Sequence, residues 1–179
     1  VEQIQNSWKS QKEISNIMIF LQDKGISSAY ATKIYKQYGQ NSIATLQENP
    51  YRLADEIWGI GFKMADQIAH KLGMPLDSPK RMTSAISYAI NQAVGHGHLY
   101  LELNTLKTHV FEILELDPAA YALRLKAALH ELHQAETIKV IKEDGQHFVT
   151  LAQFLFTEKA IAKKIQLLLN SPVVHNFNY

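Results

Sequence analysis

The sequence predicts a mainly α-helical fold: a tandem helix-hairpin-helix followed by a winged-helix-like helical domain with a small β-hairpin. Three observations lead to this prediction. Apolar residues recur at helical spacing along most of the chain, a glycine-containing segment occurs twice without a gap, and one Asp-Gly pair separates two strand-like runs. With 179 residues, 46% of them hydrophobic, the chain can form one or two small cores.

The first predicted domain, residues 1–76, consists of short helices separated by glycine and proline. An apolar stripe from Ile14 to Leu21 marks the first helix, which stops at Gly25. Later helices are predicted over residues 28–38, 42–48 and 62–72. Between the last two, a further helix is predicted to begin with Asn49 as N-cap and Pro50 in the first turn.

The second predicted domain, residues 77–170, follows a turn-rich joint that ends at Pro79. Its order of helix, short strand, helix, helix and β-hairpin is that of a winged helix. A last helix over residues 152–170 should bury Leu155, Ile161, Ile165 and Leu168. The other elements are a helix that stops at Gly95, a strand over 98–102, a helix capped by Asn104, a helix opened by Asp117 and Pro118, and two strands around Asp144-Gly145.

Residues 25–34 align with residues 59–68 without a gap. A self-match of this kind indicates two copies of one structural unit. Because each copy lies between two predicted helices, we interpret the pair as a tandem helix-hairpin-helix. The identical positions are Gly25/Gly59, Ile26/Ile60, Ala31/Ala65, Ile34/Ile68 and, further along, Gly39/Gly73.

The hairpin in each copy suits a phosphate of the DNA backbone. Glycine bares the main chain, and the amides that open the next helix point outward at the positive end of the helix dipole. The alternative is a pair of tight turns in a helical core, and the duplication favours DNA. The expected contacts are Gly59, Ile60, Gly61 and Lys63, and more weakly Gly25, Ile26 and Ser27, where Ser27 replaces the second glycine.

The helix after Pro118 carries a second candidate surface. Lys126, His130 and His133 follow one another at i, i+4 and i+7. We expect this face to lie opposite the apolar face of the same helix and to make secondary DNA contacts, as in a winged helix. The alternative is a solvated polar face. The apolar face consists of Leu125, Leu129 and Leu132.

Charge and motifs exclude several other functions. The net charge is +1, from 18 basic and 17 acidic residues, so DNA contact must come from a few well-placed groups. The sequence contains no phosphate-binding Gly-x-x-x-x-Gly-Lys-Ser/Thr loop, and we predict no catalytic residue and no ATP hydrolysis by these residues. The histidines form no recognisable metal-ligand pattern. A base-excision glycosylase is rejected because Asp77 is too close to the hairpin to serve as its catalytic carboxylate.

The sequence also bears on location. It contains no cysteine, no apolar run of the roughly 18 residues that a membrane span needs, and no signal-peptide pattern. We therefore expect a cytoplasmic protein that makes no membrane contact.

Several segments resemble the helix-hairpin-helix region that precedes the motor in RecD/TraA-type (RecD-like) DNA helicases. The resemblance covers nearly the whole chain and is most specific between Gly25 and Gly73. The segments are 25–31, 48–53, 57–66, 95–101 and 158–162.

This resemblance implies an accessory region of an ATP-dependent helicase active in DNA repair or recombination. A superfamily 1 motor that moves 5′ to 3′ would follow, joined through residues 171–179, and that motor would use ATP and Mg. The partners would be single-stranded or forked DNA and the motor in cis. The chain begins at Val1, and we expect a piece of a longer protein. The alternative is a docking module that packs on the motor or on a partner without binding DNA, which the near-neutral charge and Ser27 favour.

Overall fold

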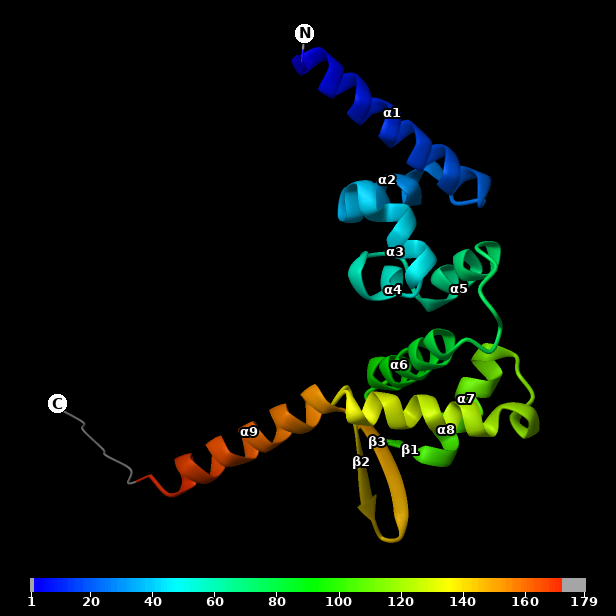
Figure 1. The fold of residues 1–179 in the computed structure, drawn as a ribbon. Helices are drawn as coiled ribbons and strands as arrows, with labels where there is room; N and C mark the ends of the chain where they lie inside the picture. Colours follow the sequence, from blue (N-terminus) through cyan, green and yellow to red (C-terminus); the bar gives the residue numbers. More distant parts are fainter. Residues whose placement is uncertain (1, 172–179) are drawn as a thin grey trace, which may run out of the picture. The chain divides into compact units, whose positions relative to one another are not determined.

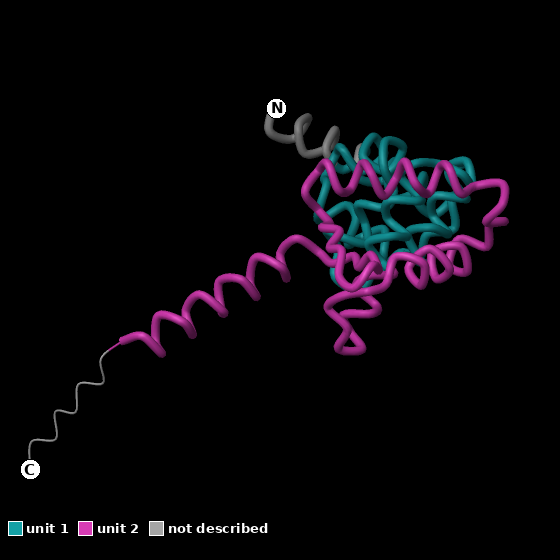
Figure 2. Tube along the Cα trace, turned by 90° about the horizontal axis from the view of Figure 1, so that it is seen from below, with its two compact units in different colours: residues 1–88 teal, residues 89–179 magenta. Residues whose placement is uncertain are grey.

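A computed structural model of the protein describes residues 2–171, except for the side chains of residues 2–10 and Glu13. The described chain is mainly helical, as predicted, and contains one small antiparallel sheet (Figure 1). It forms two compact units, residues 1–88 and 89–179, and the division falls within one helix, α6 (Pro79–Gly95) (Figure 2). The predicted linker at 171–179 lies, apart from Ser171, outside the described residues.

The first unit contains the predicted tandem of helices. Residues 28–38 and 42–48 are helical as predicted, but the helix expected to start at Asn49 begins only at Arg52. Asn49 Oδ1 instead accepts a hydrogen bond from the Tyr51 N–H at 3.2 Å, which forms a turn ahead of the helix. The elements are α1 (Glu2–Asp23), α2 (Ser28–Tyr38), the 3₁₀ turn η1 (Gly39–Asn41), α3 (Ser42–Glu48), α4 (Arg52–Glu56), α5 (Phe62–Lys71) and the first part of α6 (Pro79–Gly95).

The core of this unit is built from the apolar positions of both repeats. Ala31 and Ala65 are both fully buried, and their small side chains allow the helices to approach closely. Phe62 stacks between Tyr51 and Tyr88, with ring centroids 5.9 and 5.2 Å apart. The main buried aliphatic residues are Leu21, Ile26, Ile34, Leu46, Leu53, Ile60 and Ile68.

A buried ion pair joins α5 to α6. The Arg81 guanidinium donates to both carboxylate oxygens of Asp66 at 2.8 and 2.9 Å, and the Tyr51 hydroxyl donates to the same carboxylate at 2.8 Å. Only 5% of the Arg81 side chain and 13% of the Asp66 side chain are exposed. Burial alone would raise the pKa of Asp66, but the hydrogen bonds from Arg81 and Tyr51 and the charge of Arg81 outweigh it and lower that pKa.

The two repeat hairpins have different backbone geometries. In the first hairpin (Gly25–Ser27), the N–H groups of Ile26 and Gly25 bond back to Leu21 and Gln22, which closes α1 in a Schellman-type end. In the second hairpin (Gly59–Gly61), the Ile60 N–H donates to the Ile57 carbonyl in a four-residue turn. Gly25 and Gly59 have φ values of 66° and 87°, in the region that favours glycine. Gly61 is extended, at φ −94° and ψ 177°.

The second unit has the predicted order of elements after α6. Its sheet is antiparallel with the order β1-β3-β2, and Asp144 and Gly145 both take positive φ in the turn of the β-hairpin. Asp117 caps α8 as expected, by accepting from the Ala119 N–H. The winged-helix assignment remains our interpretation of this order. The elements are β1 (Leu101–Glu102), α7 (Leu103–Leu114), α8 (Pro118–Gln134), β2 (Ile138–Glu143), β3 (Gln146–Leu151) and α9 (Ala152–Leu169).

Asn104 does not cap α7. The N-cap position is occupied by Glu102, two residues earlier, and the helix begins at Leu103. The Glu102 side chain forms no cap hydrogen bond with the helix backbone, and its carboxylate instead accepts from the Thr105 hydroxyl at 3.0 Å.

The expected burial of α9 is wrong. Ile161, Ile165 and Leu168 are 53%, 50% and 73% exposed, and Leu155 is only half-buried. The helix leaves the sheet after its first turn, so within the described part of the second unit its later turns have no second element to pack against (Figure 1). Helical spacing of apolar residues thus identified the helix correctly without showing whether its apolar face is covered.

Replacing Arg81 by Met should destabilise the protein by about 3 kcal/mol, because the Asp66 carboxylate stays buried without its charged partner. Urea denaturation measures this effect. The exposed pair Lys139–Glu136 is the matched control, and Glu136→Gln should have a much smaller effect. An equal loss of unfolding free energy in both variants would contradict the assignment of Arg81 and Asp66 as a stabilising buried ion pair.

The same ion pair should make stability depend on pH in the acid range. Because the pKa of Asp66 is lowered in the folded state, its contribution is complete above the ordinary value near 3.8 and is lost as the pH falls through the folded-state value. Asp66→Asn should therefore flatten the decline of unfolding free energy below about pH 4. A decline as steep as that of the unsubstituted protein would show that the Asp66 carboxylate is not a source of the acid dependence.

The two glycines of the second hairpin should differ in their tolerance of a side chain. Gly59→Ala should cost about 1–2 kcal/mol, because its φ of 87° is strained for an L-residue, and a Cβ there would lie 3.2 Å from Lys33 Nζ. A Cβ at Gly61 would have no atom within 4 Å, so Gly61→Ser should stay within about 0.5 kcal/mol. Urea denaturation of both variants tests this ranking, and a reversed order would refute it.

Candidate nucleic-acid interface

The second hairpin leads into a helix start that no side chain caps. Gly61 is the N-cap of α5 and forms no side-chain cap hydrogen bond. Within the described residues, no hydrogen-bond acceptor contacts the N–H groups of Gly61, Phe62 and Lys63. Ile60 is 2% exposed and anchors the hairpin, while Gly59, Gly61 and Lys63 are exposed. This arrangement leaves main-chain donors and one ammonium group available to an anion.

The first hairpin is already partly satisfied by its own side chain. Ser27 is the N-cap of α2, and its hydroxyl oxygen lies 3.5 Å from the Tyr30 nitrogen in a long N–H···O contact. Ile26 is 4% exposed and plays the anchoring role of Ile60. The hairpins therefore share their anchor and their bared glycine, but the first places a hydroxyl oxygen where a phosphate oxygen would approach.

Two lysines connect the repeats reciprocally. Lys71 of the second copy donates to the Gly25 carbonyl at 3.1 Å, and Lys33 of the first copy donates to the Trp58 carbonyl at 3.2 Å. We call these the cross-repeat lysine bonds. The alignment could not predict them, because Lys33 aligns with Gln67 and Lys71 aligns with Gln37.

The hairpins lie in a locally cationic environment. Lys33, Lys36, Lys63 and Lys71 are all exposed, and within the described chain none of them forms a salt bridge. The nearby Glu56 is paired with Arg52 at 2.7 Å. A net charge of +1 for the whole chain thus coexists with a set of uncompensated ammonium groups beside the predicted contacts.

Sequence reasoning missed Trp58, which precedes Gly59 directly. Its side chain is 92% exposed, the largest exposed fraction among the large hydrophobic residues described. Lys33 Nζ lies 5.8 Å from the centre of its ring. Its position next to the hairpin glycine was the only signal available in the sequence.

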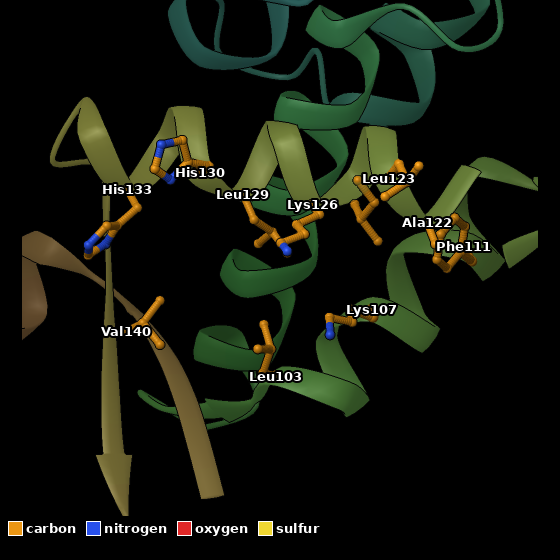
Figure 3. Close-up of a pocket in the computed structure, with 11 residues that line it drawn as sticks. Leu103, Lys107, Phe111, Ala122, Leu123, Lys126, Leu129, His130, His133 and Val140 are labelled. Carbon is orange, nitrogen blue, oxygen red and sulfur yellow. The ribbon is translucent and has the colours of Figure 1, made fainter. Parts of the chain in front are cut away.

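Lys126, His130 and His133 lie together in the second unit, but not opposite the apolar face as expected. They border an apolar pocket of about 460 Å³ between α7, α8 and β2, which Leu125 and Leu129 also line (Figure 3). Lys126 follows Leu125 by one residue, which is about 100° around a helix, so the two faces adjoin. Lys107 of α7 adds a further cation to the rim.

Two other kinds of feature are absent from the described residues. No group of three or more His, Asp or Glu side chains is placed to hold a metal ion in that part of the chain. No helix among these residues has the length and apolarity to cross a membrane.

Both hairpins lie within a segment that matches a known protein family. Residues 10–100, which include both hairpins, match the family described as the ATP-dependent RecD2 DNA helicase HHH domain. The chain is also 28% identical over 173 residues to the ATP-dependent RecD2 DNA helicase of Deinococcus radiodurans, and the match covers 93% of this chain. It spans 24% of that relative's length. The chain therefore belongs to the RecD2 helicase helix-hairpin-helix family.

Proposed function

We propose that this chain is the DNA-gripping accessory region of a RecD-like ATP-dependent DNA helicase, and that its second hairpin holds the sugar-phosphate backbone. The uncapped start of α5 is the observation that carries the proposal. The N–H groups of Gly61, Phe62 and Lys63, which have no acceptor among the described residues, and the Lys63 ammonium group supply donors for one or two phosphate oxygens.

The proposed grip does not read the base sequence. Main-chain amides and lysines contact phosphate oxygens, which are the same for every base. The first hairpin contributes less in this proposal, because the Ser27 hydroxyl occupies the approach to the helix start. Gly25 and Ile26 then mainly shape and anchor that hairpin.

The wider role follows from the family. The proposed parent is a cytoplasmic helicase of DNA repair or recombination whose motor uses ATP and Mg to move 5′ to 3′. These residues would not hydrolyse ATP, because their sequence lacks a phosphate-binding loop. The accessory region would keep DNA close to the motor while the motor steps.

Exchanging the residues at the two helix starts tests the proposal. Gly61→Ser should weaken DNA binding about five-fold or more, because a hydroxyl then occupies the place of the phosphate oxygen. Ser27→Gly should strengthen binding by opening the first helix start. Both variants should fold normally, because both positions are exposed and have negative φ. Fluorescence anisotropy with labelled single-stranded, duplex and forked DNA provides the affinities.

Salt dependence and a bulky variant complete this test. Binding should weaken gently with salt, with a slope of roughly −0.7 to −0.9 per phosphate neutralised and only a few phosphates involved. Gly61→Leu should abolish it. A slope as steep as that of a highly basic protein, or full binding by Gly61→Leu, would overturn the backbone grip.

The apolar pocket of the second unit favours a second candidate function, protein docking. Leu123 is 82% exposed and Val140 is 40% exposed at this pocket. Its rim carries Lys107, Lys126, His130 and His133, and no carboxylate lines it. In this proposal the occupant is an amphipathic protein segment of the motor or of a partner, with apolar side chains flanked by carboxylates.

A pair of synthetic helical peptides tests this second function. One peptide places Leu at i, i+3, i+4 and i+7 with Glu elsewhere, and the other replaces every Glu by Lys. The protein should bind the acidic peptide at least ten-fold more tightly, and Val140→Glu should remove that binding, as measured by anisotropy. Leu167→Ala, at an exposed apolar position on α9, is the control and should bind normally. Equal affinity for the two peptides would eliminate the docking function.

A further inference from the structure

The turn that carries the exposed indole of Trp58 is anchored by the residues at its two ends, Ile57 and Ile60. Ile57 and Ile60 are 7% and 2% exposed, so both ends of the turn are anchored in the core. The Ile60 N–H donates to the Ile57 carbonyl at 3.0 Å and closes the turn around Trp58 and Gly59. The backbone of Trp58 is therefore fixed, and its side chain is presented to solvent, where it is 92% exposed.

Lys33 fixes this presentation further. Its ammonium group donates to the Trp58 carbonyl at 3.2 Å and lies 5.8 Å from the centres of both the Trp58 and the Tyr30 rings. The hydrogen bond joins the first repeat to the loop that carries the indole. With so large an exposed fraction, the ring still offers a face to a ligand.

The surroundings of the ring suit a nucleotide better than a protein surface. Trp58 borders a shallow depression of about 310 Å³, whose other lining residues are Lys33, Lys36, Gln37, Glu56 and the buried Ile57. A protein-binding aromatic residue normally lies among other apolar contacts. Here Trp58 is the one aromatic residue among the lining residues, which include two lysines, and the one carboxylate is paired with Arg52 at 2.7 Å.

We propose that Trp58 is a stacking platform for one unpaired nucleobase, with Lys33 and Lys36 beside the flanking phosphates. The inference rests on the proposed function, since the hairpin would hold the backbone of the same strand. Stacking on an aromatic ring requires an open base face, which single-stranded DNA offers and an intact duplex does not. The platform thus gives the grip a preference for single-stranded DNA and for the unpaired side of a junction.

The spectroscopic test uses the full 179-residue chain with Trp8→Phe, so that Trp58 is its only tryptophan. The chain is titrated with oligothymidine, with a blunt duplex, and with the same duplex carrying a single-stranded overhang. Oligothymidine and the overhang should quench the Trp58 emission on binding, and the blunt duplex should not. Equal quenching by all three DNAs, or no quenching by any that bind, would overturn the platform.

Affinity measurements separate the platform from the hairpin grip. Trp58→Ala should lower affinity for oligothymidine about ten-fold or more and leave blunt-duplex affinity unchanged, whereas Trp58→Phe should keep most of the binding. Leu76→Ala, at an exposed apolar residue of the same unit, is the matched control and should have no effect.

The outcomes are distinguishable. If Gly61→Leu abolishes binding while Trp58→Ala changes nothing, the platform is wrong and the hairpin grip stands. If Trp58→Ala weakens oligothymidine and duplex equally, the ring contributes no preference and the inference fails. If the unsubstituted chain binds no DNA at low salt, the proposed function and the platform fail together.

Discussion

The hairpins depend on the burial of one isoleucine in each of them. Ile26 and Ile60 insert into the core, and this insertion makes the adjoining main chain face outward. A turn held only by its own hydrogen bonds could present its amides in several directions. Fixing one of these directions on binding would cost free energy and lower the affinity for a phosphate. The core therefore determines where these N–H groups lie.

The rest of the first unit reinforces this orientation. The bond network of Tyr51, Asp66 and Arg81 fixes α5 at its middle, one turn beyond the helix start that we propose as the phosphate site. It also neutralises a carboxylate that would otherwise lie close to the expected phosphate. A protein whose net charge is only +1 can form a locally cationic site in this way, because the pairing of Asp66 and Glu56 with arginines leaves the lysines uncompensated.

The parts of the fold that sequence predicted are those controlled by local signals. The bounds of α2 and α3 and the turn at Asp144-Gly145 depend on caps, prolines and glycines within a few residues. The burial of α9 was mispredicted because apolar periodicity does not reveal whether another element covers the face. Lys33 and Lys71 contact positions that lie 25 and 46 residues away from them in the sequence, and no short-range pattern specifies such pairs. Within the interface, the glycines and Lys63 were therefore accessible to sequence reasoning, whereas Trp58 was not.

The cross-repeat lysine bonds make the two copies dependent on each other. Each copy supplies a donor that the other copy's hairpin uses, and the two donors occupy different positions in the repeat. The two copies are therefore complementary in structure. Deleting or transplanting one copy alone would leave the remaining hairpin without its lysine, so the two copies form one structural module.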